Sequence, residues 1–452
     1  MKEKLSISSY TAIGVMLFAL FFGAGNLIFP AQLGQYAGEN LWPAITGFLI
    51  TGVGLPLLGI MAMSFSGSRD LQQLAGRVTP AYGIFFTVLL YLTIGPFFAA
   101  PRTGTVAFEV GIAPLLGEGA MQIGLLVFTF LFFAATLLFS LYPAKIVQTV
   151  GKFLAPGLVV LLGILLITAM VNPMGEAGTP QAAYQNGAFV QGFLEGYNTM
   201  DALASLVFGI IVIKAIRNMG VTSTNGILKS TAKAGLVAIG LLGAIYVGIA
   251  YLGATSVEVV GLASNGGPVL SSAVSHYFGS VGSLLLAVLI LLACLTTAIG
   301  LTISCAEYFH TLLPRFSYRT LVVFFTSITF IIANFGLSNI ISFSIPVLMF
   351  LYPLAIVLML LAFVSPLFQH KQAVYIAAIG VTFIIALFDG LKALCDSLGI
   401  EYFSWMTAVI SFFERTLPLY DKGLGWLLPA LLATVIAAAI VKIQKVSTAE
   451  AN

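Results

Sequence analysis

Two interruptions in apolar segments contain the residues best suited to bind a small charged solute. The first apolar segment contains the run Phe22-Gly-Ala-Gly-Asn-Leu-Ile-Phe-Pro30, with two glycines, an asparagine and a proline near its middle. Glycine weakens a helix by about 1 kcal/mol and proline by about 3 kcal/mol, so this run predicts an unwound stretch. Unwound backbone at membrane depth persists only where its N–H and C=O groups face a cavity or a ligand. A kink that serves tight packing is the alternative reading, but it leaves the side chain of Asn26 without a partner.

The second interruption is predicted in the segment 190–216. This segment contains the run Tyr197-Asn-Thr-Met-Asp-Ala-Leu-Ala-Ser205, followed by Phe208 and Gly209. It brings a carboxylate, Asp201, and a hydroxyl, Ser205, into an apolar environment. Paired interruptions at corresponding positions of two halves of a chain indicate a transporter binding site, where helix N-termini bind an anionic group and free carbonyls coordinate a cation.

Two charged residues occur inside the segment 81–112. Arg102 and Glu109 are seven residues apart, which is two helical turns, so they share a face. A charge at the bilayer centre costs about 2.5 kcal/mol or more and points inward or pairs. Two readings stay open. Arg102 either holds a carboxylate or Asp201 at the central site, or it is held by a helix-end carbonyl or by Glu109.

The segment 281–310 contains a possible cation site. The carbonyl of Ala293 and the adjacent hydroxyls of Thr296 and Thr297 supply the oxygen ligands that a hard cation prefers. Threonines that bond back to their own helix are the alternative. Glu307 and His310, near the inner end of this segment, are predicted to lie at the membrane interface, and a gate contact is the second reading.

Composition assigns the chain to the polytopic membrane proteins. Of its 452 residues 60% are hydrophobic and 8% are charged, and the mean hydropathy is +1.07. Soluble domains contain roughly 25% charged residues. The net charge of +3 gives no reason to expect nucleic acid as a partner, and no obligate protein partner is evident. Because no metal-ligand spacing, nucleophile elbow or phosphate loop is found, an enzyme is not expected.

Hydropathy predicts an all-α fold with twelve transmembrane helices, since a bilayer core of about 30 Å needs ~20 apolar residues per helix. The stretch 400–418 is apolar but short, and is predicted to be interfacial or re-entrant. Helices one to five (8–171) and six to ten (190–365) form two inverted sets, because each set has an odd number of spans. Two more helices (372–443) and a cytoplasmic tail (443–452) complete a single transporter domain, 1–442. The predicted spans are 8–36, 41–65, 81–112, 121–142, 148–171, 190–216, 229–256, 281–310, 320–336, 338–365, 372–390 and 423–443.

The distribution of lysine and arginine predicts the orientation in the cell membrane. With the N-terminus inside, 15 of the 19 basic residues lie in inner segments or at inner span ends. Lys392, Arg415 and Lys422 lie in the last outer loop. Both termini are therefore predicted to be cytoplasmic.

The chain resembles the bacterial branched-chain amino acid:cation symporters over essentially its whole length. The resemblance is most specific in the two runs quoted above, in Pro101-Arg-Thr-Gly-Thr105 and in Ile340-Ile-Ser-Phe-Ser-Ile-Pro346. That family is similar in turn to transporters with the bacterial leucine transporter fold, which have five-plus-five inverted helices and unwound first and sixth spans. The resemblance implies leucine, isoleucine and valine as substrates and Na⁺ as the coupling ion.

The resemblance also implies roles for individual residues. The amino acid's charged groups meet backbone N–H and C=O groups in the first break, at Phe22, Gly23, Ala24, Gly25 and Asn26. Ser205 faces the substrate and Phe208 packs on its side chain. Sodium is bound by the carbonyls of Ala19, Phe22 and Ala293 and by the hydroxyls of Thr296 and Thr297.

The sequence departs from the leucine transporter in ways that bear on the mechanism. The seventh span has no asparagine and Leu203 replaces a threonine ligand, so a second sodium ion is not expected and Asn26 is left to support the break. Arg102 has no counterpart there. The prediction is Na⁺-coupled import by alternating access. Proton coupling through Asp201, Glu109 or Glu307 is the alternative, and a channel is a third reading.

Overall fold

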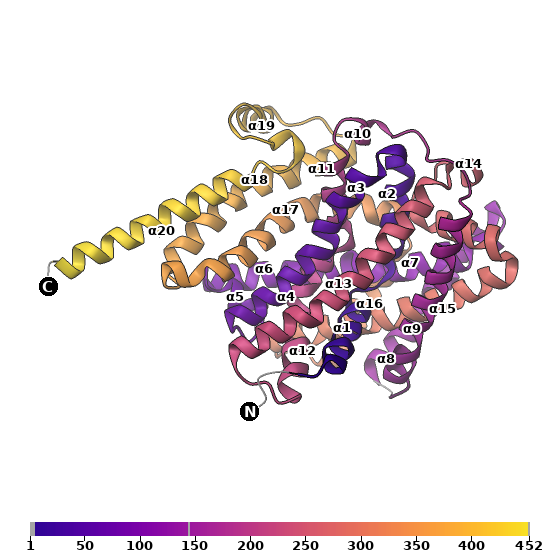
Figure 1. Cartoon of the computed structure of the whole chain (residues 1–452), viewed down its shortest axis with the longest axis horizontal. Coiled ribbons are helices and arrows are strands. Elements are labelled where there is room, and N and C mark those ends of the chain that lie inside the picture. The colour runs from indigo at the N-terminus through magenta and orange to yellow at the C-terminus, as the bar shows by residue number, and fades with distance from the viewer. Residues whose placement is uncertain (1–4, 143–144, 451–452) are drawn as a thin grey trace.

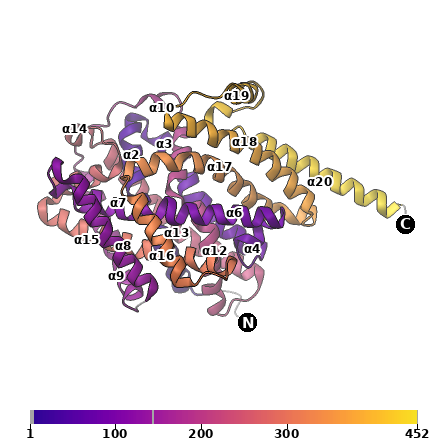
Figure 2. The same cartoon turned by 180° about the vertical axis from the view of Figure 1, so that it is seen from behind.

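The computed structural model describes residues 5–142 and 145–450, and these ranges contain helices and connecting segments without a β-strand. Figure 1 shows the arrangement, and Figure 2 shows it from behind. The elements are α1 (Ile7–Phe21), α2 (Ala24–Ala37), α3 (Leu41–Leu49), η2 (Ile50–Gly54), α4 (Leu55–Ser66), α5 (Leu71–Ala75), α6 (Pro80–Leu92), η3 (Thr93–Phe97), α7 (Ala99–Gly111), α8 (Met121–Leu141), α9 (Lys145–Val171), α10 (Ala182–Gln185), α11 (Ala188–Glu195), η6 (Gly196–Thr199), α12 (Asp201–Asn218), α13 (Thr224–Ala254), α14 (Val257–Val260), α15 (Gly266–Leu312), α16 (Tyr318–Ala333), α17 (Leu337–Val364), α18 (Gln372–Leu398), α19 (Ser404–Thr416), η8 (Tyr420–Lys422) and α20 (Leu427–Glu450).

Several long helices begin at a residue whose hydroxyl caps the first turn. Thr79 accepts a hydrogen bond from the N–H of Tyr82 at the start of α6, and Ser223 and Ser317 act in the same way before α13 and α16. These side chains satisfy N–H groups that have no partner inside a helix. The capping residues Thr79, Ser223 and Ser317 therefore determine where these three helices start.

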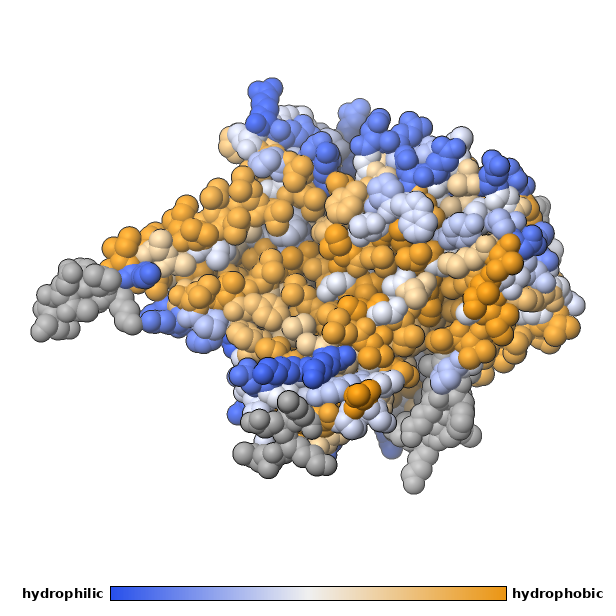
Figure 3. Space-filling view, viewed as in Figure 1, coloured by the Kyte–Doolittle hydropathy of each residue, from blue (hydrophilic) through white to orange (hydrophobic). Residues whose placement is uncertain are grey.

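The molecular surface is that of a membrane protein. Figure 3 shows a broad hydrophobic belt between two hydrophilic edges. Among the described residues, eight helical stretches are long and apolar enough to cross a membrane, or nine if α11 and α12 are taken as one bent span. Helical segments lie over each of the twelve predicted spans, but α1, the apolar part of α9 (Pro156–Val171) and α16 are shorter. The number twelve and the inverted repeat therefore stay predictions.

Helices α2 and α13 pack closely against each other at glycine residues. A Cβ atom added at Gly34 of α2 would lie 1.9 Å from the carbonyl oxygen of Ala250 on α13. In the opposite direction, a Cβ at Gly253 would lie 2.1 Å from the oxygen of Ala31. Small residues allow such backbone-to-backbone approach in membranes. Helix α2 is thereby fixed against α13, and it carries the first break.

The structure adds three details to the predicted elements. The segment 257–280, between the predicted seventh and eighth spans, is largely helical, since α14 and the first arm of α15 lie in it, and α15 bends at Gly279, where φ is +61°. Helix α20 extends to Glu450, so most of the segment predicted as a cytoplasmic tail is helical, and its position relative to the membrane stays a prediction. The third span is itself interrupted between α6 and α7, at the non-helical Gly95 and at Pro96.

The C-terminal helices form a group at one side. Helix α18 packs against α17 and α20, and α20 extends beyond the rest of the molecule (Figures 1 and 2). The stretch 400–418 contains the short helix α19, whose Trp405 and Phe413 rings contact Phe388 of α18. Helix α19 is not among the helices long and apolar enough to span, as predicted.

Candidate functional site

The first predicted break is present, at the junction of α1 and α2. Helix α1 ends at Phe21 and α2 begins at Ala24, with Gly23 extended between them. The side-chain oxygen of Asn26 accepts a hydrogen bond from the backbone N–H of Gly23, at 2.9 Å. In a continuous helix that N–H would bond to the carbonyl of Ala19. The asparagine thus stabilises the break and leaves the Ala19 carbonyl without its helical partner.

The second break is also present, but it lies earlier than the predicted site residues of the sixth span. Segment η6 ends at Thr199, Met200 has φ +61°, and α12 begins at Asp201 after a bend of 46°. A left-handed non-glycine residue costs roughly 1–2 kcal/mol and therefore needs support from its surroundings. Ser205 lies one turn inside α12, where its hydroxyl donates to the carbonyl of Ala202 at 2.6 Å, and Phe208 follows it within the same helix.

The two breaks lie side by side. A Cβ at Gly25 would be 3.7 Å from the carbonyl oxygen of Thr199. The amide nitrogen of Asn26 donates to Oδ2 of Asp201 at 2.5 Å and also to the hydroxyl of Tyr246 on α13. The Tyr246 hydroxyl donates in turn to the same carboxylate oxygen, at 3.1 Å. We call Asn26, Asp201 and Tyr246 the central polar cluster, and it connects three helices through buried side chains.

Arg102 of α7 holds the second break from the other side. One guanidinium nitrogen donates to the carbonyl oxygen of Asn198 at 2.8 Å, and the guanidinium lies 5.2 Å from the centre of the Phe29 ring on α2. The side chain is 2% exposed. The structure therefore agrees with part of each reading of Arg102. The side chain lies close to the centre, and it is held by a helix-end carbonyl. Within residues 5–142 and 145–450, no ion pair joins it to Glu109.

One of the predicted cation ligands of α15, Thr297, lies beside the first break. The hydroxyls of Thr296 and Thr297 both donate to the carbonyl of Ala293, at 2.9 and 3.0 Å. A Cβ at Gly23 would lie 3.7 Å from the methyl carbon of Thr297. The back-bonding expected of threonine is thus observed, and Thr297 is also adjacent to the break. A threonine hydroxyl that donates to a carbonyl of its own helix can still coordinate a cation, because its oxygen keeps lone pairs that accept.

The other charged candidates lie away from the central polar cluster. Glu109 is half-buried on α7 beside Gly267, at the start of α15. Glu307 is exposed near the end of α15, and His310 contacts the carbonyl of Phe316 through Nδ1 at 2.9 Å. Both side chains are exposed, and their position at the membrane interface stays a prediction.

Sequence reasoning missed two residues of this region. Tyr246 is one of 16 tyrosines and lies in a span with no other distinguishing feature, so its position opposite Asn26 is a property of the packing. Asn198 was part of the quoted run, but its carbonyl, which Arg102 contacts, carries no sequence signal.

Comparison with known proteins identifies the family. The family model described as "Branched-chain amino acid transport protein" matches residues 6–444. The chain belongs to this family. The branched-chain amino acid permease BrnQ of Bacillus subtilis is 48% identical over 431 residues, which are 95% of this chain and 96% of that protein. BrnQ of Escherichia coli K12 is 41% identical over 437 residues, or 97% and 96% of the two chains. The family member described here is thus a multi-pass membrane transporter, and not an enzyme.

Solved structures support the fold. Mhp1, a nucleobase-cation-symport-1 family transporter in a closed conformation, superposes with a TM-score of 0.59 at 16% identity, covering 96% of this chain and 93% of its own. MhsT in complex with L-phenylalanine gives a TM-score of 0.52 at 16% identity, covering 98% and 99%. The fold is that of the leucine transporter-like proteins, as the sequence resemblance implied.

Proposed function

We propose that the protein imports leucine, isoleucine and valine by Na⁺ symport through alternating access. The amino acid's charged groups bind at the paired breaks, where the N-terminus of α2 presents unpaired N–H groups and favours a carboxylate. Both similar permeases bear names that specify branched-chain amino acids. An apolar pocket separates ligands that differ by one methylene by only about 1–3 kcal/mol, so all three substrates are expected.

The observation that carries the sodium proposal is the position of Thr297 beside Gly23. Through its methyl group Thr297 of α15 contacts the break at the end of α1, where the Ala19 carbonyl has lost its helical partner, and a rotation of the side chain would turn its hydroxyl toward the break. A cation there bridges the first and eighth spans and stabilises the broken shape of the first. Sodium and substrate then favour each other's binding, because each selects the same arrangement of the break.

The central residues are closed to solvent, which supports alternating access. Asn26, Arg102 and Asp201 are 2%, 2% and 4% exposed. Because a substrate reaches such residues only when helices move apart, binding and release require at least one other conformation.

The first experiment measures uptake of labelled leucine into proteoliposomes with an inward Na⁺ gradient, with choline in place of sodium, and with a protonophore. Sodium-driven uptake that resists the protonophore is expected. In Thr297→Ala we expect the sodium concentration for half-maximal uptake to rise about tenfold, since one ligand is worth roughly 1.5 kcal/mol. Thr297→Ser keeps the hydroxyl and is the matched control, expected within threefold of the wild type. Unchanged sodium dependence in Thr297→Ala contradicts the site.

Proton coupling through Asp201 is the second candidate. The carboxylate is buried between two uncharged donors, Asn26 and Tyr246, and among the described residues it forms no ion pair. Uptake that continues without sodium, collapses with a protonophore and is lost in Asp201→Asn would favour this candidate over sodium.

A further inference from the structure

A separate cavity lies at the outer end of the sixth span. Its volume is about 290 Å³, and it opens between α11, α17, α18 and η8. We call it the α11–α18 cavity. Ligand pockets for larger molecules begin at roughly 300 Å³, so this cavity suits a ligand the size of a free amino acid. It belongs neither to the central polar cluster nor to the predicted cation ligands.

The floor of the cavity contains a buried carboxylate with an open coordination position. Asp389 of α18 is 5% exposed, and its Oδ2 has no hydrogen bond of normal geometry in the described part of the chain. Its neighbour is the hydroxyl of Tyr420, whose pKa is raised by burial and by the Asp389 carboxylate, so it stays protonated. A buried carboxylate oxygen that accepts no hydrogen bond of normal geometry is costly, and a positively charged group bound there would remove that cost.

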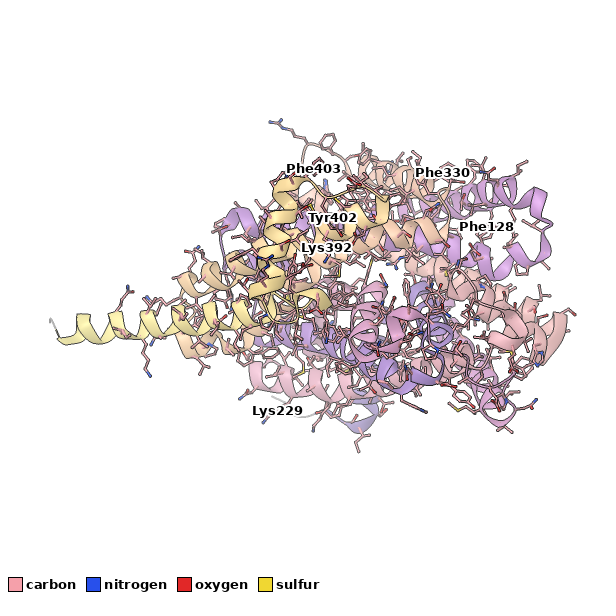
Figure 4. The ribbon with its side chains drawn as sticks, turned by 90° about the horizontal axis from the view of Figure 1, so that it is seen from above. Phe128, Lys229, Phe330, Lys392, Tyr402 and Phe403 are labelled. Carbon is pink, nitrogen blue, oxygen red and sulfur yellow. The ribbon has the colours of Figure 1, made fainter. Side chains whose placement is uncertain are left out.

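Cationic side chains lie at the rim of the same cavity. Lys392 and Lys422 both line it, and the Lys392 ammonium lies 5.7 Å from the centre of the Tyr420 ring. Lys392 also forms an exposed ion pair with Glu414, at 3.4 Å. Such an exposed pair is worth about 1 kcal/mol or less, so the ammonium is easily drawn to a competing carboxylate. Figure 4 shows Lys392 and Tyr402 among the C-terminal helices.

The remaining acid groups at the rim are partly engaged. Asp396 accepts a hydrogen bond from the Tyr402 hydroxyl at 2.5 Å, and this bond raises the pKa of Tyr402 to about 12. Asp421 is exposed. Between the charged groups the wall is apolar, formed by Val190, Leu194 and Met349.

We propose that the α11–α18 cavity binds a free α-amino acid with an aliphatic side chain. Its ammonium group binds Asp389, its carboxylate binds Lys392 or Lys422, and its side chain contacts the apolar wall. A simple cation would bind Asp389 but supply no anion to Lys422, which forms no ion pair among the described residues, and a simple anion would leave Asp389 unpaired. A zwitterion satisfies both sets of groups. The choice of an amino acid rests on the proposed function.

The cavity is connected to the central site through α11. Leu194, in the cavity wall, is six residues from Met200 at the second break, or about 9 Å along a helix. A ligand bound there contacts the segment that must move when the central site opens. Since Lys392 and Lys422 lie in the loop predicted to be outside, the site would take up substrate from the outer solution before it reaches the breaks.

The test is the number of labelled leucine molecules bound per purified protein at saturation, measured in detergent with and without sodium. The wild type is expected to bind two. Ala393→Trp fills the cavity from α18 and is expected to reduce the number to one, and its matched control is Leu394→Trp, because Leu394 is exposed and does not line the cavity. Asp389→Asn tests the charge, with an expected loss of at least tenfold in affinity for the second leucine.

Competing ligands separate the possible outcomes. Isopentylamine lacks the carboxylate and isocaproate lacks the ammonium, and neither is expected to displace the second leucine at tenfold excess. Displacement by the amine alone would mean a cation site and overturn the proposal. A single bound leucine in the wild type, unchanged in Ala393→Trp, would also overturn it. A different result would contradict the proposed function. In Ala393→Trp only the central site is expected to bind leucine, and an affinity of that site that is equal with and without sodium would argue against Na⁺ symport.

Discussion

The hydroxyl of Tyr246 gives the sharpest test of how the two breaks are held together. It accepts a hydrogen bond from Asn26 and donates one to Asp201 at 3.1 Å, so it contacts both broken spans. Tyr246→Phe removes only this oxygen from a buried ring. The carboxylate then keeps the hydrogen bond from Asn26 and loses the one from Tyr246, and a hydrogen bond to a charged group contributes about 1.5–3 kcal/mol.

That loss translates into an expected change in transport. If substrate binds only when the breaks are held together, the apparent affinity falls with the population of that arrangement. At about 1.4 kcal/mol per factor of ten, the KM for leucine is expected to rise roughly 10- to 100-fold. The half-saturating sodium concentration should rise in parallel, because the same break carries the proposed cation ligands.

The assay is sodium-driven leucine uptake into proteoliposomes over a range of both ligands. The control is Tyr197→Phe, since Tyr197 is also buried at the second break but its hydroxyl has no hydrogen-bond partner among residues 5–142 and 145–450. It is expected to stay within threefold of the wild type. A KM within threefold for Tyr246→Phe, or an equal rise in both variants, would refute the reasoning.

Two further substitutions test the supports of the site. Arg102→Lys keeps a charge but loses the planar guanidinium that lies over the Phe29 ring and binds the Asn198 carbonyl. Leucine uptake is therefore expected to fall at least tenfold, while the protein yield, measured by quantitative immunoblot, stays within twofold of the wild type. Gly34→Ala would place a methyl group 1.9 Å from the Ala250 carbonyl oxygen and is expected to lower the melting temperature in detergent by several degrees, because overpacking costs about 1–3 kcal/mol. Gly240→Ala on α13 meets open space, so only the better helix propensity of alanine acts and the melting temperature should stay the same or rise slightly.

Much of this architecture could be predicted from hydropathy and from single residues. The positions of the apolar helices follow from composition, and the first break follows from two glycines and Asn26, whose cost inside a helix is local. The role of Asn26 was predictable for the same reason, because its side chain replaces the helical partner of a nearby N–H. These features depend on a few residues that are neighbours along the chain, so they can be predicted from the sequence.

The remaining features depend on contacts between distant segments. Within the quoted run the second break falls at Met200, because the Arg102 guanidinium on α7 binds the Asn198 carbonyl and the Asn26 amide on α2 binds the Asp201 carboxylate. Tyr246 became part of the site only through the packing of α13 against α2. The interruption at Gly95 was signalled by Pro96, but the same signal occurs at Pro346 and Pro353 of α17, which continues through both. Whether a proline breaks a helix depends on its neighbours in space.

The polar side chains at the centre explain which backbone groups are left for ligands. A break frees several N–H and C=O groups, and each one that stays unpaired in the membrane interior costs several kcal/mol. Asn26 satisfies the N–H of Gly23, and Arg102 satisfies the carbonyl of Asn198. Neither side chain binds the carbonyl of Ala19, which belongs to the last turn of α1, next to the break where Gly23 contacts Thr297. A cation at that position would therefore complete the hydrogen bonding and coordination of the first break, and its departure would raise the free energy of the broken shape, which is the physical condition for coupling ion movement to substrate release.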